Sequence, residues 1–116
     1  MSDEAPTLGL QDFQNILKVL DYCADQGAFK SWSTIQQVFA VRNRYDVFVK
    51  YAETPTEEEA PTLGLQDFKN ILIIFDLAAD EGAFKGWSTI QQVLIQRTRI
   101  VDFVDYIEAL NAEKAA

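Results

Sequence analysis

Four aspartates are the residues of this sequence best placed to do chemistry. They form two pairs with a four-residue spacing: Asp21 with Asp25, and Asp76 with Asp80. In a helix this spacing puts both carboxylates of a pair on one face, where they can hold a divalent metal. Bundles that bind two metals through carboxylates also use histidine, and the sequence has none. We therefore expect no metal or other cofactor, and ion pairs of Asp21 with Arg42 and of Asp76 with Arg97.

The single cysteine, Cys23, is the other candidate group. It has no disulfide partner in the chain, and we expect a small buried apolar residue instead of a reactive thiol. The sequence also lacks a glycine-rich phosphate loop and any set of serine or cysteine with histidine. We predict that the protein is not an enzyme.

A tandem repeat organises the chain. Residues 5–53 recur at 60–108, and 32 of the 49 aligned positions are identical. Between the copies, residues 54–59 contain Pro55 and three glutamates, which predicts an exposed acidic linker. With 116 residues the chain is long enough for one compact domain and short for two, so we expect 1–116 to be a single domain.

The first half of copy one predicts an amphipathic helix. Its apolar residues recur at three- and four-residue steps: Leu10, Phe13, Leu17, Leu20 and Ala24. We expect Gly9 to cap its start with the Asp12 carboxylate facing the free amides, and Gly27 to end it in the left-handed conformation. Copy two repeats these marks at Gly64, Asp67 and Gly82.

A second helix is predicted in each copy. In copy one its apolar face would comprise Ile35, Val38, Tyr45, Phe48, Val49 and Ala52. We expect it to begin at Ser33, capping Gln36, and at Ser88, capping Gln91. The short connection makes each copy an antiparallel hairpin, and one hairpin is too small to bury a core. We therefore predict an all-α fold, a pseudo-twofold four-helix bundle made of two tandem helical hairpins.

Aromatic residues flank both hairpin turns: Phe29, Trp32, Phe84 and Trp87. Such rings can form a stacking platform for a ligand, but they more often fill the end of a bundle, and we expect the second role.

The copies differ mainly in the middle of their helices. Leu20 and Phe39 in copy one become Phe75 and Leu94 in copy two, which indicates a large and a small residue exchanged within one core layer. We infer a homodimeric hairpin that was duplicated and then differentiated, either by evolution or by engineering of a fused dimer.

Two surfaces are candidate binding sites. Lys18 and Tyr22 become Ile73 and Leu77 in copy two, and we predict that these two apolar residues bind a partner, unless the linker or the last helix covers them. The second candidate is an apolar pocket between the copies for a small molecule, with the lining residues Tyr22, Cys23, Tyr45, Leu77, Ala78 and Ile100.

The formal net charge of −8 disfavours nucleic acid and anionic membranes as partners. The N-terminus has no signal-peptide pattern, and no apolar stretch is long enough to span a bilayer, so we expect a soluble cytoplasmic protein.

The pattern Asp-x-x-x-Asp-x-Gly-Ala-Phe-Lys, between an Ile/Leu/Val-rich helix and a second helix that follows Ser-Thr-Ile, occurs in both copies. It resembles small helical proteins of tailed phages over about 40 residues of each copy. The resemblance implies a helical hairpin and an intracellular phage context, and it implies no substrate.

The sequence thus favours a non-enzymatic interaction or assembly module that binds a protein partner or self-associates. The alternatives are a bundle that binds a small apolar ligand and an engineered single-chain scaffold with asymmetric pairing.

Overall fold

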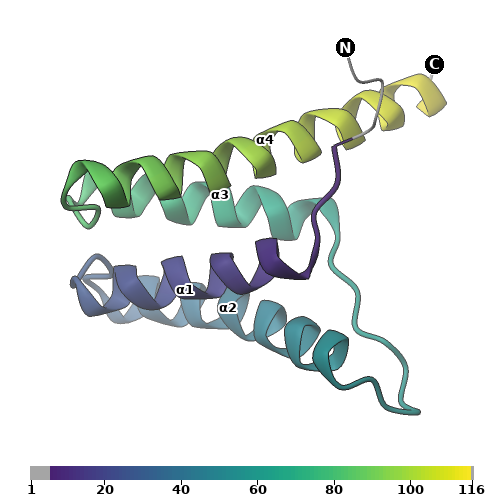
Figure 1. The fold of residues 1–116 in the computed structure, drawn as a ribbon, viewed down its shortest axis with the longest axis horizontal. Helices are drawn as coiled ribbons and strands as arrows, with labels where there is room; N and C mark the ends of the chain where they lie inside the picture. Colours follow the sequence, from purple (N-terminus) through teal and green to yellow (C-terminus); the bar gives the residue numbers. More distant parts are fainter. Residues whose placement is uncertain (1–5, 116) are drawn as a thin grey trace.

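A computed structural model describes residues 6–115, which form four helices (Figure 1). Their bounds are α1 Leu10–Asp25, α2 Trp32–Glu53, α3 Leu65–Asp80 and α4 Trp87–Ala115. No strand occurs within this range. Ala5, the first residue of the first repeat, and the N-terminal residues that we searched for a signal peptide lie outside the described residues.

The helices pack as two antiparallel hairpins, α1 with α2 and α3 with α4. The hairpins then face each other, with α1 beside α4 and α2 beside α3, and both turns lie at the same end of the molecule (Figure 1). The packing of α1 on α4 therefore has its counterpart in the packing of α2 on α3, across an approximate twofold axis. The all-α four-helix bundle predicted from the sequence is confirmed. None of the four helices has an apolar run long enough to cross a bilayer.

The starts and ends of α1 and α3 follow the predicted chemistry. The backbone N–H of Gly9 donates to Asp12 Oδ2 at 2.8 Å, and Gly64 donates to Asp67 Oδ2 at the same distance. Each carboxylate thus satisfies an amide that the helix leaves free. After the last turn, Gly27 has φ 75°, a left-handed conformation that favours glycine, as predicted.

The predicted start of the second helix was wrong by two residues. Ser31, not Ser33, is the N-cap of α2, and its Oγ accepts a hydrogen bond from the Thr34 N–H at 3.1 Å. In copy two, Gly86 takes this position with φ 94°, and its carbonyl accepts from the Ile90 N–H at 3.0 Å. Trp32 and its repeat therefore occupy the first helical turn instead of the connecting loop.

The core lies between the hairpins and is built from one face of each helix. In α1 the buried face is turned relative to the predicted one, because Ile16 and Cys23 are buried while Leu10 and Ala24 are exposed. The large side chains that are almost completely buried are Tyr45, Phe75, Ile16, Leu20, Ile71 and Ile100.

The predicted exchange of core volume between copies was also wrong. Leu20 and Phe75 are buried, but Phe39 is 63% exposed and Leu94 is 56% exposed. The two latter residues therefore fill no core layer.

The expectation that aromatic rings fill the end of the bundle holds for only half of them. Phe29 and Phe84 are half-buried and pack against the core. Trp32 and Trp87 are each 79% exposed, so they contribute little to the core. Their exposure is the same in both copies, which makes it a property of the repeat.

We expect Phe75→Ala to lower the free energy of unfolding by about 3–5 kcal/mol, because it leaves a cavity in the core. Phe39→Ala, the matched control on an exposed ring, should cost less than about 1 kcal/mol. Urea unfolding followed by circular dichroism measures both. Equal losses in the two variants would contradict the described core.

Candidate functional site

Two arginine–aspartate pairs join the hairpins. Arg99 of α4 donates through Nε to Asp12 Oδ1 at 2.7 Å and through Nη2 to Oδ2 at 2.9 Å. Arg44 of α2 binds Asp67 of α3 in the same way, at 2.6 and 2.9 Å. These are charge-assisted, two-point contacts, which fix orientation as well as distance. They hold the first turn of each first helix against the other copy.

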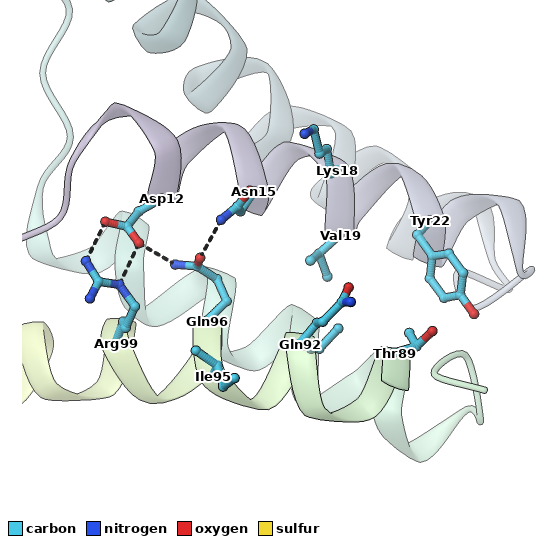
Figure 2. Close-up of a pocket in the computed structure, with 11 residues that line it drawn as sticks. Asp12, Asn15, Lys18, Val19, Tyr22, Thr89, Gln92, Ile95, Gln96 and Arg99 are labelled. Atoms are coloured by element: carbon cyan, nitrogen blue, oxygen red, sulfur yellow. Dashed lines mark hydrogen bonds and ion pairs between the residues drawn. The ribbon is translucent and has the colours of Figure 1, made fainter. Parts of the chain in front are cut away.

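A side-chain network extends the pair on the α1–α4 side only (Figure 2). Gln96 donates through Nε2 to Asp12 Oδ1 at 3.2 Å, and its Oε1 accepts from Asn15 Nδ2 at 3.1 Å. The counterpart of Gln96 in copy one is Val41, which has no polar side-chain atom. The two sides of the bundle are therefore chemically different although their ion pairs match.

The arginines also set the charge state of the buried carboxylates. The Asp12 side chain is only 9% exposed, and the hydrogen bonds from Arg99 lower its pKa to about 2 against the opposing effect of burial. The pKa of Asp67 is lowered by Arg44 for the same reason. Both carboxylates stay ionised over the whole neutral range and do not serve as proton donors there.

A groove of about 630 Å³ opens between α1 and α4 beside this network (Figure 2). The pair of Asp12 and Arg99 forms one end of it, and Tyr22 with Thr89 forms the other. Between the ends the groove is lined by aliphatic side chains, including Ile95, and by polar ones, including Gln92. The groove thus combines apolar and polar groups, as small-molecule sites do.

Apolar side chains, most of them exposed, form a stripe on each of the second helices. Outer stripe one comprises Trp32, Ile35 and Phe39 of α2, and outer stripe two comprises their counterparts Trp87, Ile90 and Leu94 of α4. The spacing of three and four residues aligns each set along one side of its helix. Ile90 is half-buried, and the other five residues are exposed.

Each stripe lies on the outside of its hairpin. Phe39 precedes by three residues Arg42, which bonds to Asp21 of α1 within the same hairpin. Leu94 precedes in the same way Arg97, which bonds to Asp76. The stripes therefore border the first helix of their own hairpin, away from the contact between copies.

The predicted ion pairs of the acidic residues are confirmed. Arg42 Nε donates to Asp21 Oδ1 at 2.6 Å, and Arg97 Nε donates to Asp76 Oδ1 at 2.9 Å. Within residues 6–115 no group of three or more acidic, cysteine or histidine side chains is arranged to hold a metal ion.

The two residues predicted to bind a partner lie on α3. Ile73 is 63% exposed, and Leu77 is half-buried and lines a small hollow with Thr34 of α2. Neither belongs to an outer stripe. They form a third, smaller apolar surface, beside the contact of α2 with α3.

The six residues of the predicted pocket are not brought together around one space. Four of them have no exposed surface and are part of the packed interior: Cys23, Tyr45, Ala78 and Ile100. Tyr22 lines the α1–α4 groove, whereas Leu77 lines the hollow near α2. Burial also raises the pKa of the Cys23 thiol to about 11, so the thiol is protonated at neutral pH.

The outer stripes and the ion pairs between copies were not predicted from the sequence. Spacing alone does not say which side of a helix faces inward, so Ile35 fits a core position and both tryptophans fit the end of the bundle equally well. Helix capping alone accounts for Asp12 and Asp67 in the sequence and leaves Arg44 and Arg99 without partners. The identity of these four residues in both copies was the available signal.

Comparison with known proteins found no matching family model, no similar curated protein and no similar solved structure.

Acid should destabilise the protein through Asp12. Because its pKa in the folded protein is about 2, below the usual 3.8, its stabilising effect is present above pH 4 and is lost as the pH falls towards 2. We expect a loss of about 1–2 kcal/mol over this range, reduced by the solvent around Arg99. Unfolding in urea at several pH values should show a weaker pH dependence for Asp12→Asn than for Asp25→Asn. An equal dependence in both variants would contradict this assignment.

Proposed function

We propose that this protein is a non-enzymatic interaction or assembly module that binds other protein chains through exposed apolar helix surfaces. The observation that carries the proposal is the pair of outer stripes, each with a tryptophan that is 79% exposed. Tryptophan is enriched where proteins bind one another and is costly to leave in water. Its exposure at the same place in both copies supports a role in binding.

The chemistry of the remaining groups supports a binding role over catalysis. Asp21 and Asp76 are held by arginines, and Cys23 is buried and protonated. An acid–base or nucleophilic mechanism needs a titrating group at an accessible place, and these side chains do not supply one.

A displayed peptide library tests this function without a known partner. Peptides selected on the intact protein should bind the Trp32→Ser/Trp87→Ser variant at least about tenfold more weakly, because each tryptophan carries a large share of the contact. Ser33→Ala/Ser88→Ala is the matched control and should retain binding. Light scattering across a series of protein concentrations measures the molar mass and so detects self-association.

The exposed Ile73 is included as a second variant, Ile73→Lys, since the α3 surface is the other apolar candidate. The proposed function would be ruled out if the protein were strictly monomeric and selected no peptides. It would also be ruled out if the selected peptides bound the tryptophan variant and the Ile73 variant as tightly as the unmodified protein.

A second candidate function is the binding of a small apolar molecule, favoured by the groove between α1 and α4. Its volume falls within the range of small-molecule sites, and its wall of Val19 and Ile95 lies between polar groups that can fix an orientation. The equivalent position of Ile95 on α2 is Ala40.

Thermal melts with a library of hydrophobic compounds test this candidate. A ligand at one hundred times its dissociation constant should stabilise the fold by about 2.7 kcal/mol. Ile95→Lys places a charge in the groove and should abolish the ligand-dependent rise in melting temperature. Ala40→Lys, the matched change in copy one, should leave that rise unchanged. No shift with any compound would remove this function.

A further inference from the structure

We infer that the protein is bivalent: its two outer stripes bind two copies of one partner, a basic amphipathic helix. The inference rests on the proposed function and specifies its occupant and stoichiometry. Four of the six stripe side chains lie mostly outside the core: Trp32, Phe39, Trp87 and Leu94.

The stripes offer nearly the same chemistry twice. Tryptophan and isoleucine are identical in both, and the third residue is Phe39 in one and Leu94 in the other. Buried positions are kept to a similar degree: Phe13, Val38 and Val49 recur as Phe68, Val93 and Val104, whereas Tyr45 corresponds to Ile100. The two stripes therefore present nearly equal surfaces, and nearly equal surfaces accept the same partner.

The two stripes are placed for independent binding. The helices that carry them, α2 and α4, are diagonal in the bundle, with α1 and α3 as the neighbours of each (Figure 1). Each stripe faces the outside of its own hairpin. A helix seated on one stripe therefore leaves the other stripe open.

The shape of a stripe matches a helix. Trp32, Ile35 and Phe39 extend over eight residues, or about 10 Å along the axis of α2. A partner helix with apolar residues every three or four positions presents a stripe of the same kind. The side chains of the two helices can then interdigitate along this length.

An exposed carboxylate near each stripe and the negative charge of the chain favour a basic partner, and the exposed Lys85, two residues before Trp87, makes stripe one the more acidic of the two. Asp25 and Asp80 end the first helices on the side that borders the stripes, four residues after the aspartates that bind Arg42 and Arg97. Both are exposed, and neither has an ion-pair partner within residues 6–115. A partner with lysines beside its apolar face gains from these charges. A second copy of this chain, also carrying −8, is repelled.

The tryptophans provide a separate reporter for each site, because the chain contains only two. The probe is a synthetic 18-residue helical peptide of leucine and lysine with leucines at positions i, i+3 and i+4. It is titrated into Trp87→Phe, which reports on Trp32, and into Trp32→Phe, which reports on Trp87. A peptide with glutamate in place of lysine is the control, and calorimetry on the unmodified chain gives the stoichiometry.

We expect two peptides per chain, blue-shifted emission from both tryptophans, and midpoints within about fivefold of each other, since one stripe has phenylalanine where the other has leucine. Phe39→Lys, measured in the Trp87→Phe background, should weaken binding at stripe one about tenfold or more. Gln37→Lys, the same change on the opposite side of α2, should have little effect, and circular dichroism verifies that both variants are folded.

Other outcomes separate this inference from the proposed function. One peptide per chain with both emissions shifted would mean a single shared site and would overturn bivalency. Equal binding of the glutamate peptide would overturn the basic partner. Self-association of the chain through the stripes, without peptide binding, would overturn the inference but leave the proposed function standing. Neither peptide binding nor self-association would overturn both.

Discussion

The aspartate at the start of each hairpin makes bonds at two levels of structure with a single carboxylate. The Asp12 carboxylate accepts a hydrogen bond from the Gly9 amide, which fixes the first turn of its own helix. It also accepts a hydrogen bond from Arg99 of the other hairpin. Asp67 does the same with Gly64 and Arg44. Helix initiation and hairpin pairing are therefore coupled, because any shift of the helix start moves the group that the arginine binds. The relative placement of the hairpins depends on this geometry.

Around these equivalent bonds the interior is asymmetric. The Tyr45 hydroxyl donates to the Asp67 carbonyl at 3.0 Å, whereas Ile100 at the matching position of copy two cannot donate. Gln96 joins the network at Asp12, and its counterpart Val41 is apolar. The twofold relation thus holds for these two arginine–aspartate pairs and fails for the side chains next to them. One side of the bundle has the polar network and the groove, and the other has the exposed Ile73.

The sequence was sufficient for those features that depend on neighbouring residues. Spacing predicted the helices, Gly9 and Gly27 marked the bounds of the first one, and the Asp21–Arg42 pair followed from charges on facing helices. The sequence was insufficient where two residues, or two sides of a helix, fit the same local pattern equally well. Ser31 and Ser33 are both suited to cap α2, and α2 has apolar residues on two sides, of which only one can face the other hairpin. Packing decides such cases, and packing involves residues distant in the chain.

Each hairpin supplies an aspartate from its first helix to one of the two ion pairs between the hairpins, and an arginine from its second helix to the other pair. A hairpin from another molecule offers the same two groups. The segment between Glu53 and Leu65 favours pairing of the two hairpins within one chain, because it keeps them at a high effective concentration. Cleavage of that segment would turn the folded bundle into a complex of two chains, and its stability would then decrease on dilution.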